Sequence, residues 1–184
     1  MGNEKQFEFI KKAFRALKTR GFYPLALTMD QCTRNVKMVR EAGASMEKPI
    51  IKIDGEDIAI IFDNPHLMKN TKNMLLKHNA IFNGKLVSYN HIKQLYYKDQ
   101  ESVPRLVPKL SDRLISLGPF MAMNVAQATR TLSYSVAKGL EYYVFSGDLP
   151  IAALGTASFV EFHDKLFDTF NSKSTQCISK VLSD

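Results

Sequence analysis

The chain has 184 residues, of which 45% are hydrophobic, and this is enough for one ordinary domain or two small ones. No apolar run is long enough to cross a membrane, and the first residues lack the apolar core of a secretion signal. The two cysteines, Cys32 and Cys177, provide neither a disulfide framework nor a zinc site, so we expect a reducing intracellular compartment. The net charge of +7 favours an anionic partner such as nucleic acid or a nucleotide.

The first part of the chain alternates between helix and strand. Apolar residues at helical spacing predict a helix over residues 4–20, ended by Gly21. The apolar run 22–29 predicts a buried strand, and a helix follows over 33–42. In PIIKIDGEDIAIIFD, Asp54 and Gly55 predict a turn between two short strands.

The remaining sequence is typical of a helical region. We predict helices over residues 65–78, 89–98, 120–145 and 156–171. The expected fold class is therefore α/β followed by α.

Two predicted strands end on a carboxylate that a helix follows, in LALTMDQCTRN at Asp30 and in IAIIFDNPHLMKN at Asp63. Open α/β sheets bind ligands at the carboxyl ends of their strands, so these two side chains are candidates to face one ligand. The alternative is that each aspartate only caps the helix after it. The pattern by itself leaves both interpretations open.

Several stretches in fixed order resemble the P-element family of DNA transposases, and the resemblance covers most of the chain. The matching stretches are TMDQCTRNVKMVREAGA, KPIIKIDGEDIAIIFDNPHLMKNTKNMLL, VPRLVPKLSDRLI, FMAMNVAQATRTLSYSVAKGL and LGTASFVEFHDKLFDTFNS. The most specific of them is FDNPHLMKN. The resemblance implies a partial ribonuclease-H-like catalytic domain over residues 1–80 and a mostly helical GTP-binding insertion domain, incomplete, over 81–184.

The resemblance also implies a role for the first carboxylate. Asp30 corresponds to the second acid of a three-acid set that holds Mg²⁺ at the end of the central strand, because this hard cation prefers oxygen ligands. Asp63 and His66 are expected to be structural neighbours of that site, with Asp63 capping the next helix and Pro65 in its first turn. The family acts on DNA at transposon ends, which implies a nuclear location.

The chain departs from the family pattern in its acids. The family's first catalytic Asp and final Glu have no place in this sequence, so we expect a fragment or domesticated remnant that neither cuts nor joins DNA by itself. Isolated in this form, it is also expected to associate with itself through uncovered sheet edges.

No GxxxxGK[ST] motif is present, so a GTP site must be built without a P-loop. The positions that match the family's GTP-binding residues are Lys109, Asn124, Val125, Ser133, Asp168 and Asn171. The carboxylate of Asp168 would accept both the N1–H and the exocyclic amine of guanine, while Lys109 would meet a phosphate or lie along the base. At Asn124 the family often has Lys, and the loss of that charge bears on phosphate affinity.

Each candidate also has a structural alternative. Asp168 and Asn171 are consistent with the outer face of an amphipathic helix. The inner face of that helix would consist of Phe159, Phe162, Leu166 and Phe170. The lysines at 69, 72 and 77 are expected to form a solvated helix face. The alternative functions are a stand-alone GTP-binding module and a DNA- or protein-binding module without catalysis.

Overall fold

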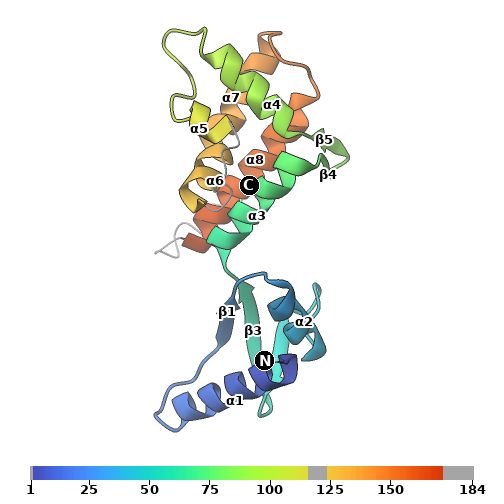
Figure 1. Ribbon diagram of the computed structural model, residues 1–184, viewed down its shortest axis with the longest axis vertical. Helices are drawn as coiled ribbons and strands as arrows, with labels where there is room; N and C mark the ends of the chain where they lie inside the picture. Colours follow the sequence, from blue (N-terminus) through green and yellow to red (C-terminus); the bar gives the residue numbers. More distant parts are fainter. Residues whose placement is uncertain (1, 116–123, 172–184) are drawn as a thin grey trace. The chain divides into compact units, whose positions relative to one another are not determined.

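The computed structural model describes residues 2–115 and 124–171, and the chain forms two compact units, Met1–Leu67 and Met68–Asp184. The first unit is mixed α/β and the second is mainly helical, which confirms the predicted fold class (Figure 1). Within the described residues, no helix combines the length and the apolar content that crossing a bilayer requires.

The first unit is built around a three-stranded sheet. Its elements are α1 (Asn3–Lys18), β1 (Ala26–Met29), α2 (Thr33–Glu41), β2 (Ile50–Ile53), β3 (Glu56–Phe62) and the start of α3 (Asn64–Lys77). The strand order is β1-β3-β2, with β1 parallel and β2 antiparallel to β3. The strand β3 is therefore the central one, and β1 lies at an edge of the described sheet.

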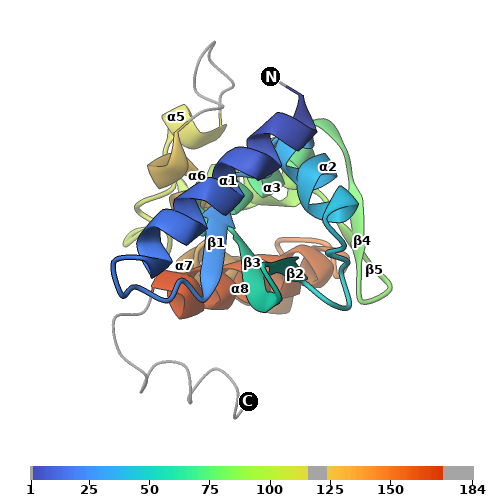
Figure 2. The same cartoon turned by 90° about the horizontal axis from the view of Figure 1, so that it is seen from below.

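Helices α1 and α2 cover one face of this sheet (Figure 2). Alternate side chains of β2 and β3 point to that face, and Ile51 and Ile58 are almost completely buried against Phe14 of α1 and Met38 of α2. Burial of this apolar surface holds the layers together.

An ion pair connects α1 to the β2–β3 turn. Arg15 donates two hydrogen bonds to the Asp54 carboxylate, one from Nε at 2.8 Å and one from Nη2 at 2.7 Å. Asp54 and Gly55 have φ values of 51° and 87°, as a two-residue hairpin turn requires. The predicted turn is therefore confirmed.

The predicted buried strand over residues 22–29 is wrong in its extent and in its burial, because only Ala26–Met29 form β1 and none of these four residues is buried. Regular pairing begins at Ala26, and the side chains of Phe22, Tyr23 and Leu25 are 63%, 72% and 79% exposed. The strand β1 pairs with β3 along one edge, and no described strand covers the other edge, so the apolar residues that lead into it have nothing to pack against.

In its described residues, the second unit contains the rest of α3, a hairpin and five further helices. Its elements are β4 (Ala80–Phe82), β5 (Lys85–Val87), α4 (Tyr89–Asp99), α5 (Asp112–Ile115), α6 (Val125–Thr131), α7 (Tyr134–Phe145) and α8 (Ala153–Asn171). The largest interface joins α7 to α8, and α8 also lies against β5. The core is formed by apolar side chains from α3, α4, α7 and α8, among them Leu75, Leu95, Leu140 and Val160.

The prediction of one helix over residues 120–145 is also wrong. Residues 116–123 lie outside the described part of the chain, and the rest forms two helices that are separated by Leu132 and Ser133. The Ser133 hydroxyl donates to the Arg130 carbonyl at 3.0 Å, and the Ser133 backbone is extended. Such a local hydrogen bond competes with continuation of the helix.

Candidate functional site

The two aspartates that end predicted strands lie at one edge of the sheet. In the parallel register Met29 is opposite Phe62, so Asp30 and Asp63 follow the same end of neighbouring strands. The Asp63 N–H donates to the Met29 carbonyl at 2.8 Å. The expectation of a shared carboxyl edge is confirmed, although Asp63 follows the central strand and Asp30 follows an edge strand of the described sheet.

The carboxylate of Asp30 is exposed and oriented by its neighbours. Its Oδ1 atom accepts hydrogen bonds from the Cys32 N–H at 3.0 Å and from Asn35 Nδ2 at 2.8 Å. These hydrogen bonds lower the pKa of the Asp30 carboxyl, and the bond from the Cys32 backbone has the largest effect. The nearby His66 lowers the pKa further. The N-cap of α2 is Cys32, so the interpretation of Asp30 as that helix cap is wrong.

Asp63 and His66 form a pair at the start of α3. Asp63 directly precedes the helix, and its carbonyl accepts from the Leu67 N–H at 3.0 Å. Its carboxylate is hydrogen-bonded to Nδ1 of His66. Pro65 is the second residue of the helix, where its missing N–H leaves no intrahelical bond unmade.

The described residues do not assemble a complete metal site at this edge. Across residues 2–115 and 124–171, no three His, Cys, Asp or Glu side chains are grouped so that they could hold a metal ion. Two-metal phosphoryl-transfer sites need several carboxylates, because each cation takes about six oxygen ligands. Asp30 alone does not meet that requirement.

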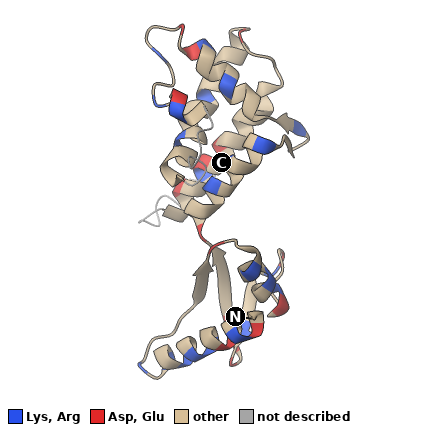
Figure 3. Cartoon of the chain, in the orientation of Figure 1, with Lys and Arg blue, Asp and Glu red and all other residues tan. Residues whose placement is uncertain are grey.

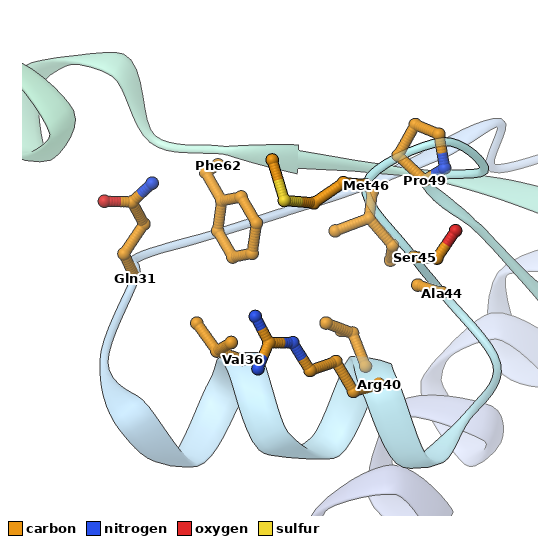
Figure 4. A pocket seen from close by; sticks show the side chains of 10 residues that line it. Gln31, Val36, Arg40, Ala44, Ser45, Met46, Pro49 and Phe62 are labelled. Atoms are coloured by element: carbon orange, nitrogen blue, oxygen red, sulfur yellow. The ribbon is translucent and has the colours of Figure 1, made fainter.

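A hollow of about 470 Å³ lies between α2 and the sheet, and Gln31, the residue after Asp30, is part of its lining. Its walls are mainly apolar and include Val36, Met46 and Phe62, while Arg40 of α2 extends into it (Figure 4). No Asp or Glu is among its lining residues, so it does not extend the carboxylate set.

The six residues that match the GTP-binding pattern lie at the ends of helices or in a turn of the second unit. Lys109 is in the loop between α4 and α5, Asn124 and Val125 begin α6, Ser133 precedes α7, and Asp168 and Asn171 are in the last turn of α8. Exposed polar groups at helix ends are suited to a polar ligand, because free backbone groups are available there.

The packing of α7 on α8 brings the start of α7, just after Ser133, near Asp164 of α8. Burial raises the pKa of the Asp164 carboxyl, the nearby Tyr134 N–H lowers it, and the charge of Asp168 raises it further. Asp164 and Asp168 are one turn apart and therefore lie on the same face of α8.

Asp164 was missed by the sequence analysis. Its spacing of four residues from Asp168 places both on one helix face, and that spacing was the available signal. Its proximity to the start of α7 depends on tertiary packing.

The start of α6 presents two polar groups of note. The Asn124 side chain accepts from the Gln127 N–H at 3.2 Å and so caps the helix. This capping bond gives a structural reason for Asn at a position where the family often has Lys. The Oε1 atom of Gln127 is buried and has no hydrogen-bond partner among the described residues.

Asp168 and Asn171 lie on the exposed face of α8, as the structural alternative expected, and this position is equally compatible with contact to a ligand. Its predicted inner face is partly wrong, because Phe162 and Phe170 are also exposed. The buried face includes Phe159, Val160 and His163, and Phe167 packs against the core. An exposed Asp168 is free to meet a ligand, whereas a core contact would have excluded that role.

The basic residues show one departure from expectation. In the first unit, Lys and Arg are concentrated on α1 and α2, and β1 and β3 have none (Figure 3).

In the second unit the predicted solvated face of α3 is wrong at Lys72. This side chain is 4% exposed, and burial lowers the pKa of its ammonium group. Among the described residues, no acidic side chain pairs with Lys72.

Comparison with known proteins identifies the family. The family model described as TNP-like, GTP-binding insertion domain matches residues 65–181. The human DNA transposase THAP9 is 28% identical over 96% of this chain, which covers 20% of that protein. The Drosophila melanogaster transposable element P transposase is 26% identical over 92% of this chain and 23% of its own length. The chain thus spans about a fifth of the length of these two relatives.

A solved structure has the same fold. The Drosophila P element transposase strand transfer complex superimposes with a TM-score of 0.83, at 23% identity, over 96% of this chain and 44% of that one. Together with the family model, which covers more than half of the sequence, this shows that the chain belongs to the P-element-type transposase family with a TNP-like, GTP-binding insertion domain.

Proposed function

We propose that this chain acts as part of a P-element-type DNA transposase and that its helical unit binds GTP. The observation that carries the proposal is the match of residues 65–181 to a GTP-binding insertion domain. It is supported by the packing of α7 on α8, which brings the start of α7 near Asp164, one turn before Asp168.

In the proposed site, Asp168 recognises guanine. A carboxylate accepts two hydrogen bonds side by side, and guanine offers two donors in that arrangement while adenine does not. Asn171, less than one turn further along α8, extends the same polar helix end. Lys109, Asn124, Val125 and Ser133 are proposed to surround the remainder of the nucleotide.

The proposed DNA chemistry belongs to the first unit. Asp30 would contribute one carboxylate to a Mg²⁺ site whose remaining ligands the described residues do not supply. Asp63 and His66 would support it from the same sheet edge. We place the catalytic-type domain at residues 1–80 and the insertion domain at 81–184, with transposon-end DNA as partner and the nucleus as location.

A second candidate is a GTP-, DNA- or protein-binding module that performs no catalysis, present as a fragment or a domesticated remnant. The incomplete acid set among the described residues favours it. The uncovered edge of β1, with exposed Phe22 and Leu25 leading into it, favours self-association of the isolated chain. Sedimentation velocity across a concentration series measures this association directly.

Calorimetric titration of the full chain with GTP and with ATP tests the proposed function. We expect GTP to bind more tightly than ATP, and Asp168→Ala to remove the preference, because a site built for a hydrogen-bonding pattern rejects a ligand that lacks it. Asp57→Ala is the matched control, since it removes an exposed carboxylate from the first unit. Equal binding of the two nucleotides, or a GTP preference that survives Asp168→Ala, would refute the assignment.

A further inference from the structure

A buried carboxylate anchors the loop that carries Lys109. Asp99, the last residue of α4, has no solvent exposure. Its two oxygens accept from the backbone N–H groups of Leu106 at 2.7 Å and Val107 at 3.1 Å. They also accept from Arg105 Nε at 3.1 Å and from the Tyr143 hydroxyl on α7 at 3.3 Å. Four donors from two segments, the loop after α4 and helix α7, thus meet at one side chain.

Arg105 extends this anchor to the turn itself. One guanidinium nitrogen donates to the carbonyls of Leu110 at 2.8 Å and Val107 at 3.4 Å. The Leu110 N–H donates to the Val107 carbonyl at 3.0 Å, which closes a four-residue turn with Pro108 and Lys109 at its centre. Val107 and Leu110 are buried, so the core holds both ends of the turn.

The result is an exposed lysine on a backbone that cannot move freely. Pro108 fixes one φ angle of the turn, and the buried ends fix its position. Holding the Lys109 backbone in place before binding reduces the ordering cost that a mobile lysine would pay on contact with a ligand. The planar fork of Arg105 reaches the carboxylate and two carbonyls together, which a lysine at that position cannot do.

We infer that Asp99 and Arg105 are positioning residues that hold Lys109 against the phosphates of a bound guanine nucleotide. This inference rests on the proposed GTP site, and it explains how the ammonium group of Lys109 is held in place there. Asp99 and Arg105 themselves do not touch the nucleotide.

A double-mutant cycle on the full chain tests this inference, with GTP and guanosine as probes. The four proteins are the wild type, Arg105→Lys, Lys109→Ala and the double variant. We expect Arg105→Lys to weaken GTP binding roughly three- to tenfold when Lys109 is present and to have little effect when it is absent. Guanosine has no phosphate, and its affinity should not change in any of the four.

The controls separate positioning from general stability. Lys98→Ala breaks the Lys98–Glu101 and Lys98–Asp148 pairs in the same unit without touching the turn, and it should leave GTP affinity unchanged. If Arg105→Lys does not fold, Tyr143→Phe takes its place, because it removes one donor to Asp99. This variant should lose less GTP affinity than Arg105→Lys, and only when Lys109 is present.

Four outcomes would overturn the inference. An equal loss with and without Lys109, or an equal loss for guanosine, would assign Asp99 and Arg105 to stability alone. Wild-type protein that binds GTP while Arg105→Lys binds it equally well would refute the inference and leave the proposed function standing. Wild-type protein that binds neither probe would refute both.

Discussion

Replacing Gly155 with alanine should destabilise the helical unit. Gly155 lies in the first turn of α8, where that helix packs directly on the β4–β5 hairpin. A Cβ atom at this position would be 2.5 Å from the backbone oxygen of Leu86 and 2.8 Å from Cβ of Lys85. The nearest obstacle is backbone that is held in a hairpin, so relief requires α8 or β5 to move.

The expected change in the free energy of unfolding is the result of two opposing effects. Overpacking of this kind costs about 1–3 kcal/mol. Alanine gains at most about 1 kcal/mol over glycine from helix propensity, and less so close to the helix start. We therefore expect a net loss of about 1–2 kcal/mol, and each kcal/mol lowers the midpoint of a domain of this size by roughly 4–8 °C.

Thermal and urea unfolding, followed by circular dichroism, measure this loss. Ser158→Ala is the control, because Ser158 is exposed on the same helix and should change stability by less than about 0.5 kcal/mol. A Gly155→Ala protein as stable as the wild type, or more stable, would show that α8 does not approach β5 as closely as described.

Three further predictions concern buried charges and the sheet edge. Lys72→Met should raise the free energy of unfolding at pH 7 by about 1–2 kcal/mol, because it removes a buried ammonium group. Since burial lowers the pKa of Lys72 in the folded state, urea titrations should show this advantage shrinking as the pH rises towards the ordinary pKa of lysine. Burial also lowers the pKa values of His91 and His163, so urea midpoints should fall between pH 7 and pH 5, where the unfolded chain binds more protons; equal midpoints would contradict this. The isolated chain should show no Mg²⁺-dependent DNA strand transfer, and transfer that is lost on Asp30→Ala would disprove that expectation.

Much of the first unit could be predicted because its boundaries are local. Gly21 and Gly43 have φ values of 82° and 100°, and each follows the end of a helix that was expected there. The Asp54–Gly55 turn is equally local. The exposed start of β1 could not be predicted, because the apolar run does not reveal whether a second strand covers it.

The errors in the second unit have a common cause in tertiary structure. Strands β4 and β5 have three residues each, too few for an alternating pattern, although the Asn83–Gly84 turn between them was a usable signal. The break before α7 has no Gly or Pro to mark it. Burial of Lys72 depends on how the helices around α3 pack.

In the candidate nucleotide site, too, the sequence indicated some residues while others depend on tertiary packing. The resemblance named Lys109, Ser133 and Asp168 as candidates, but it did not indicate Asp99, whose carboxylate accepts from the backbone of Leu106 and Val107 in the loop that carries Lys109. Asp99 is buried at the end of a helix where a solvated carboxylate would be the ordinary expectation. Such partners become visible only when the fold is known.

Amide NMR of the full chain during a GTP titration tests the central claim most directly. We expect saturable shifts that concentrate on Ser133, Asp168 and Asn171 and on the turn at Lys109, with ATP producing weaker shifts at the same concentrations. The absence of saturable shifts, or shifts confined to other parts of the chain, would contradict the proposal that this unit binds GTP.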